Sequence, residues 1–262
     1  MCIFSDTVEK ISSTNIFARA RGDRQTIVYS MAYAAKNELA MVLPIPVPAN
    51  SPEDAVRFIS LESCPHFFDE LRAGFPTRYE DNSIGAALTD AEVEAPIRTL
   101  EVQKVGCYEA SFVPRPEDFA RLDERFRLPV QIWLELNRYR DWGFAVFKLK
   151  PTELAFVHPM AFEFPRRDQS RLFFPTLHIH NRKLASSAHY DHKLYCHPEP
   201  AMNWHLQKWE DSISPASSYV KCVEAAQLLD LKAICWRVFV DGNRENRDTW
   251  VGKGETIPAW RA

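Results

Sequence analysis

Five of the chain's eight histidines fall in the segment HIHNRKLASSAHYDHKLYCH, residues 178–197. Imidazole nitrogens bind transition metals and transfer protons near neutral pH, so the segment is a candidate reactive site. On a β-strand, alternate side chains point to the same face, which places His178 beside His180. Two imidazoles so placed can share one cation and form the first half of a metal site.

The second half of such a site depends on how the segment pairs with itself. We expect residues 172–180 and 189–196 to form an antiparallel hairpin. If His180 lies opposite His189, then His178 faces Asp191, because opposed residues share a face of the sheet. This register places three imidazoles and one carboxylate on one side.

A slip of one residue changes the partners. His180 then faces Tyr190, and His178 faces His192. Either register brings at least three imidazoles together, and the sequence leaves both open. Metal-free acid/base chemistry, contact with a substrate and a purely structural role are the alternatives. The hypothesis is a divalent metal ion, Zn or Fe before Mn or Cu, held by ligands drawn from His178, His180, His189, Asp191 and His192.

Cys2 is the second candidate, as a catalytic nucleophile. Removal of Met1 would expose a thiol together with its own α-amine, which can act as the base. In this respect the first 25 residues resemble the N-terminal-nucleophile hydrolases with cysteine, and Arg21-x-Asp23 matches the Arg and Asp on the next hairpin of one branch. The amidotransferase branch has glycine where this chain has Ile3. The structural alternative is a small buried cysteine at the start of an edge strand.

Two further segments, LAMVLPIPVP and RRDQSRLFFPTLHIH, are similar to those of an uncharacterised bacterial protein family with a Cys-led N-terminus. That resemblance implies one shared domain and no particular activity.

The elements that must position these residues indicate an α+β fold with mainly antiparallel β-sheets and flanking helices. Residues 15–21 and 25–34 are extended runs, and Gly22-Asp23 between them predicts a hairpin. We expect a single domain, 1–262, in which residues 76–98 form a long loop and possible lid. Further strands are expected at 39–47, 101–113, 144–149, 154–164, 172–180, 190–196 and 234–240. Helices are expected at 51–59, 66–73, 115–126, 130–140 and 217–229.

Composition narrows the functional classes. Hydrophobic residues make up 46% and charged residues 26% of the chain, the balance of a globular protein. The net charge of −3 predicts neither a nucleic-acid nor a membrane partner. Without a signal-peptide pattern, we expect a cytoplasmic location. The six cysteines contain no CxxC, so reduced thiols are expected.

Together these features favour an intracellular metal-dependent hydrolase or oxygenase acting on a small molecule or peptide. A Cys2-dependent amidohydrolase is the second hypothesis. The third is a non-catalytic domain that binds a ligand or another protein. The sequence does not determine the oligomeric state.

Overall fold

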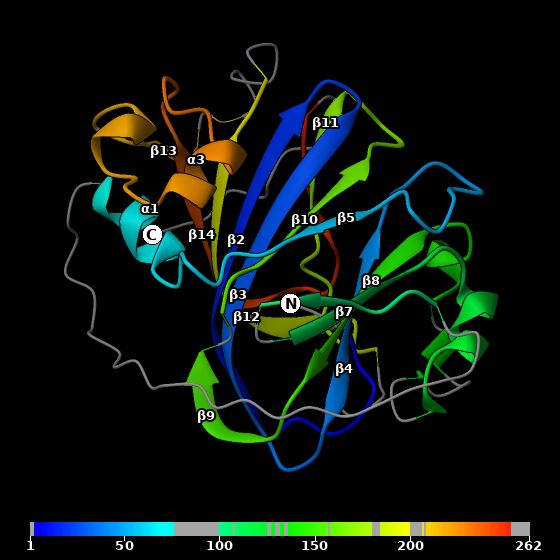
Figure 1. Ribbon diagram of the computed structural model, residues 1–262. Helices are drawn as coiled ribbons and strands as arrows, with labels where there is room; N and C mark the ends of the chain where they lie inside the picture. The colour runs from blue at the N-terminus through cyan, green and yellow to red at the C-terminus, as the bar shows by residue number, and fades with distance from the viewer. Residues whose placement is uncertain are drawn as a thin grey trace.

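β-Strands are the main regular structure of the described chain and are arranged as two large sheets and one small one (Figure 1). The computed structural model describes residues 3–75, 100–106, 108–124, 127–128, 132–133, 136–156, 158–179, 184–199, 206 and 208–252. The strands are β1 (Ile3–Phe4), β2 (Lys10–Arg21), β3 (Arg24–Ala35), β4 (Leu39–Ile45), β5 (Arg57–Ile59), β6 (Gln103–Val105), β7 (Tyr108–Val113), β8 (Gly143–Leu149), β9 (Thr152–Phe156), β10 (Met160–Pro165), β11 (Arg171–Phe174), β12 (Ser187–His197), β13 (Glu210–Asp211), β14 (Trp236–Glu245) and β15 (Thr249–Gly252).

The largest sheet has the strand order β13-β14-β12-β2-β3-β10-β5, with β9 also paired to β3. Its pairs are antiparallel except β12 with β2, which run parallel. β2 and β3 form the expected hairpin, and Gly22 at its turn has φ +59°, a value that glycine adopts readily. This hairpin is the centre of the sheet.

The second sheet has the order β1-β4-β8-β7-β6, and β11 pairs only with β15. β4 contains Pro44, which cannot donate a ladder hydrogen bond. β1 covers β4 only at Met41 and Val42, while Pro44 lies opposite Phe144 of β8. Pro44 therefore lies in the part of β4 that β1 does not pair with.

The described residues form three apolar clusters, and strand alternation explains their separation. On β2, Ile16 and Ala18 face the main cluster between the two large sheets, whereas Phe17 faces outward. On β4, Met41 faces the same main cluster and Val42 faces the opposite side. Each large sheet is thus buried on both faces. This explains why its central strands carry apolar residues at successive positions and not only at alternate ones.

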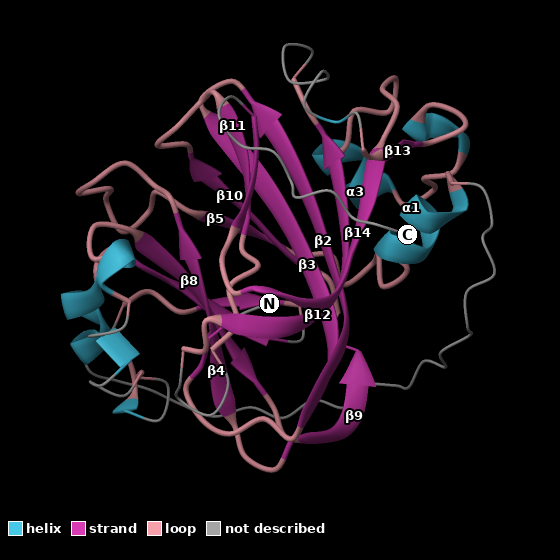
Figure 2. Ribbon diagram, turned by 180° about the vertical axis from the view of Figure 1, so that it is seen from behind, coloured by secondary structure: helices cyan, strands magenta, loops and turns pink. Residues whose placement is uncertain are grey.

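Short helices cover the outer faces (Figure 2). α1 and α3 lie together on the outer face of the large sheet, where Phe67 of α1 and Ala225 of α3 pack around Phe17. Short 3-10 segments cover the outer face of the second sheet through Phe119 and Tyr139. The helices are η1 (Pro116–Arg121), η3 (Asn137–Tyr139), η5 (Ala216–Ser218), α1 (Phe67–Ala73) and α3 (Val223–Leu228).

The expectation of a mainly antiparallel β-rich fold is confirmed, but the flanking helices among the described residues are shorter than predicted. The helix expected at 51–59 is wrong. β5 occupies its end because Phe58 and Ile59 pair with β10. The helix expected at 66–73 is confirmed by α1. The predicted loop 76–98 lies outside the described residues. No helix among the described residues is long and apolar enough to cross a membrane.

Candidate functional site

His178 and His192 lie together in the interior, with their Nε2 atoms 3.3 Å apart. Both rings are buried, and Tyr190 packs against each, with ring centroids 4.3 and 4.9 Å away. The main chain of His178 is held by Asn246, whose Oδ1 accepts its N–H and whose Nδ2 donates to its carbonyl. Burial is the main cause that lowers the pKa of His192 well below its ordinary value, and the neighbouring His178 adds to it. A neutral pair sharing one N–H satisfies this geometry.

The predicted hairpin between residues 172–180 and 189–196 is wrong. β11 pairs with β15, and β12 is enclosed between β14 and β2. His178 lies beyond the end of β11 and approaches His192 through tertiary packing instead of strand pairing. His180 lies outside the described residues.

His189 and Asp191 lie on the other face of β12 from His192, as strand alternation requires. His189 is exposed and opposite Asn243 of β14. The Oδ2 atom of Asp191 accepts a hydrogen bond of 2.6 Å from the backbone N–H of Ser13. The structure therefore joins His178 with His192 but separates this pair from His189 and Asp191.

Asp191 has a structural role that its position in the sequence did not indicate. Ser13 lies at a break in the β2–β3 register and has φ +55°, so its N–H points out of the ladder. The carboxylate of Asp191 supplies the missing acceptor. Burial raises the pKa of Asp191, and the backbone N–H groups of Ser13 and Thr14 oppose that shift.

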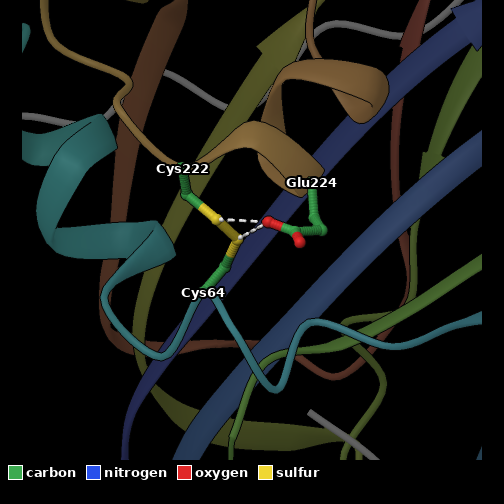
Figure 3. A group of neighbouring side chains, drawn as sticks. All are labelled: Cys64, Cys222 and Glu224. Carbon is green, nitrogen blue, oxygen red and sulfur yellow. Dashed lines mark hydrogen bonds between the residues drawn. A yellow bond between two sulfur atoms is a disulfide. The ribbon is translucent and has the colours of Figure 1, made fainter.

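Among the described residues, the group arranged closely enough to share a metal ion is Cys64, Cys222 and Glu224 (Figure 3). The two cysteines form a disulfide with a Cα–Cα distance of 5.8 Å. The expectation of reduced thiols throughout therefore fails at this pair, which is 158 residues apart in sequence.

A row of polar side chains crosses five strands on the outer face of the large sheet. Successive strand pairings place His197 beside Arg19, Arg19 beside Thr26, Thr26 beside Glu163, and Glu163 beside Arg57. Because paired residues share a face, the row is continuous.

This row borders a surface hollow of about 410 Å³ next to the end of α3. Three arginines line it, together with a single carboxylate, that of Glu163. The full lining is Arg19, Arg21, Thr26, Arg57, Ile59, Glu163, Gln227 and Leu228.

The charges around the hollow are unequal. The carboxylate of Glu163 lies 2.5 Å from Arg24 and 3.2 Å from Arg57. Arg19 donates to the carbonyl of Leu228 and lies 3.7 Å from Asp230. With the exposed Arg21, the hollow and its rim hold four guanidinium groups and only two carboxylates, those of Glu163 and Asp230. The net charge there is therefore positive.

His197 forms the inner end of the row, buried beneath α3. Its Nδ1 accepts a hydrogen bond of 3.0 Å from the backbone N–H of Asp230. Burial, and then the charge of Arg19, lower the pKa of His197 to about 4. The imidazole is therefore neutral at neutral pH, and its acceptor nitrogen anchors the chain just after α3.

Sequence reasoning missed this hollow because its side chains come from β2, β3, β5, β10 and α3. One signal was available. Arg19-x-Arg21 on a predicted strand places two guanidinium groups on one face, by the parity that placed His178 beside His180. The other hypothesis for this region, a Cys2 nucleophile aided by Arg21 and Asp23, cannot be followed, because Cys2 lies outside the described residues.

No family model and no curated protein matches the chain. Among solved structures, it is similar to baculovirus P35, with 12% identity and a TM-score of 0.47 over 96% of this chain and 99% of that one. It is also similar to P35 in the caspase-8/P35 complex, with 13% identity and a TM-score of 0.41 over 92% and 96%. A mutated baculovirus P35 after caspase cleavage matches with 13% identity and a TM-score of 0.43 over 94% and 100%.

The expectation of a metal-dependent hydrolase or oxygenase is corrected. The hairpin that was to assemble three imidazoles is not formed, and the described residues bring no histidine into a group that could share an ion. The expected small-molecule or peptide substrate is corrected with it, because the described residues do not assemble the site that was to act on it.

Proposed function

We propose that the chain is a non-catalytic protein-binding domain that takes an acidic side chain of its partner into the arginine-lined hollow. The observation that carries this proposal is the convergence of Arg19, Arg21 and Arg57 on one open face, with Glu163 as the lone carboxylate of the lining. Guanidinium groups bind carboxylates through paired N–H donors, which makes arginine the residue suited to such recognition.

The electrostatics favour an incoming anion. The side chain of Arg19 is only 14% exposed. Burial first, and the charge of Arg21 second, lower the pKa of Arg19, so the free hollow disfavours its own positive charge. A carboxylate placed between Arg19 and Arg21 would attract both guanidinium groups and so offset both effects. Arg57, whose side chain is 66% exposed, can turn toward the same ligand.

The surroundings suit a protein better than a small ion. Gln227 lines the hollow, and Val223 lies four residues before it on α3, hence on the same helix face. Val223 is 72% exposed, an uncommon position for a large apolar side chain. Arginine beside exposed apolar surface is typical of protein interfaces.

The test uses two immobilised peptides that differ only in a central Asp or Asn, with binding of the whole protein measured by interferometry. We expect the Asp peptide to bind at least about tenfold more tightly, which corresponds to ~1.4 kcal/mol for one charged contact. Arg21→Glu and Arg57→Glu should each abolish that preference. Equal affinity for the two peptides, or a preference that survives both substitutions, would show that the hollow is not the binding site.

Arg140→Glu is the matched control, because Arg140 is an exposed arginine next to η3, on the layer that covers the other sheet. It makes the same charge change and should leave binding intact. Caspase-8 is included as a protein probe, and its capture by the wild type but not by Arg21→Glu would extend the result from a peptide to a folded partner. Failure of the wild type to bind the Asp peptide and caspase-8 alike would contradict the proposal.

A further inference from the structure

The disulfide partners come from two segments that cover the large sheet. Cys64 lies between β5 and α1 and is 2% exposed, while Cys222 is the residue immediately before α3 and is half-buried. Glu224 projects from the first turn of α3 toward both sulfur atoms (Figure 3). We propose that Cys64 and Cys222 form a reversible redox latch between the α1 and α3 segments, and that Glu224 controls how fast it exchanges.

The two segments do not need the S–S bond to stay together. Glu70 of α1 accepts hydrogen bonds through Oε2 from the backbone N–H groups of Lys221 and Cys222, at 2.9 and 3.2 Å. This contact holds the start of α3 against α1 in either redox state. Opening the bond therefore leaves the two sulfurs near each other and ready to close again.

The surroundings also provide acceptors for the dithiol form. Oε2 of Glu224 lies 3.3 Å from Sγ of Cys222 and 3.7 Å from Sγ of Cys64, within reach of either S–H. The carbonyl of Ser63 lies 3.8 Å from Sγ of Cys222. Because each thiol has a polar partner waiting, reduction leaves no unsatisfied donor.

Accessibility separates this pair from the other described cysteines. Cys196 and Cys235 are buried, and burial raises the pKa of both thiols, so neither reacts readily. Cys222 is the member of the pair that solvent reaches, while Cys64 lies behind it. An external thiol is thus directed to the sulfur of Cys222.

A low-molecular-weight thiol such as glutathione can reduce the Cys64–Cys222 disulfide in two balanced steps. A glutathione thiolate attacks Sγ of Cys222, which forms a mixed disulfide and releases Cys64 as a thiolate that takes up a proton. A second glutathione then attacks the mixed disulfide, which releases Cys222 as a thiol and glutathione disulfide. Two glutathione molecules are oxidised and one protein disulfide is reduced to two thiols. Glutathione disulfide is the oxidant for the reverse reaction.

Glu224 slows the first step for two reasons. Its carboxylate repels the incoming thiolate, and it disfavours the negative charge that develops on the leaving sulfur of Cys64. The same carboxylate stabilises the reduced form by accepting a hydrogen bond from the thiol. Replacing it with an amide should speed exchange and shift the equilibrium toward the disulfide.

The test incubates the native protein in glutathione buffers of graded redox ratio, quenches it with N-ethylmaleimide and unfolds it in excess reagent. We expect all six cysteines to be alkylated after reducing buffer and two fewer after oxidising buffer. Peptide mass mapping should find Cys64 linked to Cys222. Absence of that linked peptide in oxidising buffer, or a link that native protein retains in reducing buffer, would overturn the latch.

Glu224→Gln tests the control of exchange separately, and Glu62→Gln is its matched control. Glu62 is an exposed carboxylate two residues from Cys64 that lies outside the sulfur cluster. Glu224→Gln should be reduced about fivefold faster than wild type, the effect of removing one charge about 4 Å from the reacting sulfur in water. Glu62→Gln should match wild type. Equal rates for the two variants would remove Glu224 from the mechanism, and thermal melts confirm that both are folded.

Discussion

The imidazole Nε2 atoms of His178 and His192 lie 3.3 Å apart although their segments do not pair as strands. Tyr190 packs on both rings, and Asn246 fixes the main chain of His178. The pair links the end of the β11 segment to the centre of β12. Its burial makes it a structural contact of the interior.

Truncating this pair should destabilise the fold. His178→Ala removes a buried ring and leaves the Nε2 atom of His192 without its partner, so the free energy of unfolding should fall by about 2–4 kcal/mol. His189→Ala is the control, because that exposed ring should change stability by less than about 0.5 kcal/mol. Urea unfolding measures both. Similar losses for the two variants would contradict the structural role of the pair.

Lowering the pH should reveal how the buried His197 affects the stability of the fold. Its pKa is lowered from 6.5 in the unfolded chain to about 4 in the folded protein. Between these values the unfolded chain holds a proton that the folded protein does not, so stability falls as the pH drops from about 6.5 to about 4. The full loss is about 3 kcal/mol, and burial of His192 acts in the same direction.

His197→Asn isolates this contribution, because asparagine places an acceptor near the position of Nδ1 and does not titrate. Its stability should vary less with pH than that of the wild type over the same window, as measured by urea unfolding in a pH series. Parallel pH profiles would show that His197 is not the titrating group.

Asp191 should stabilise the bulge in β2. Asp191→Ala removes the acceptor for the N–H of Ser13 and should cost about 1–3 kcal/mol in unfolding free energy. Asp241 is the matched control, since it is the exposed carboxylate directly opposite Asp191 on β14. Asp241→Ala should be neutral or slightly stabilising, because like charges opposite each other repel. The reverse ranking in urea unfolding would refute this role.

The latch and the hollow share α3, which joins the two proposals. Cys222 precedes this helix, whereas Gln227 and Leu228 at its other end line the hollow. Reduction removes the covalent restraint on α3 while the Glu70 contact at its start remains, so binding of the Asp peptide should weaken only on the order of threefold, or ~0.7 kcal/mol. The comparison is made by interferometry with and without reductant, and Cys222→Ser should bind like the reduced protein in both buffers. Unchanged affinity would show that the latch and the hollow act independently.

Local features were predictable because they depend on neighbours in sequence. Extended apolar runs and Gly22 predicted the β2–β3 hairpin, and α1 lies where a helix was expected at 66–73. Ser51-Pro52 and the apolar spacing that follows favour a helix at 51–59, but the pairing of Phe58 with β10 overrides that local preference.

The sequence by itself determined a β-rich antiparallel chain and the strand parity of its side chains. Only the tertiary structure decided which strands are neighbours, since strand pairing joins residues far apart and leaves no local pattern. It brought His178 to His192, aligned Arg19 with Glu163, and brought Cys64 to a residue 158 positions away. The hollow and the latch therefore exist only in the folded chain.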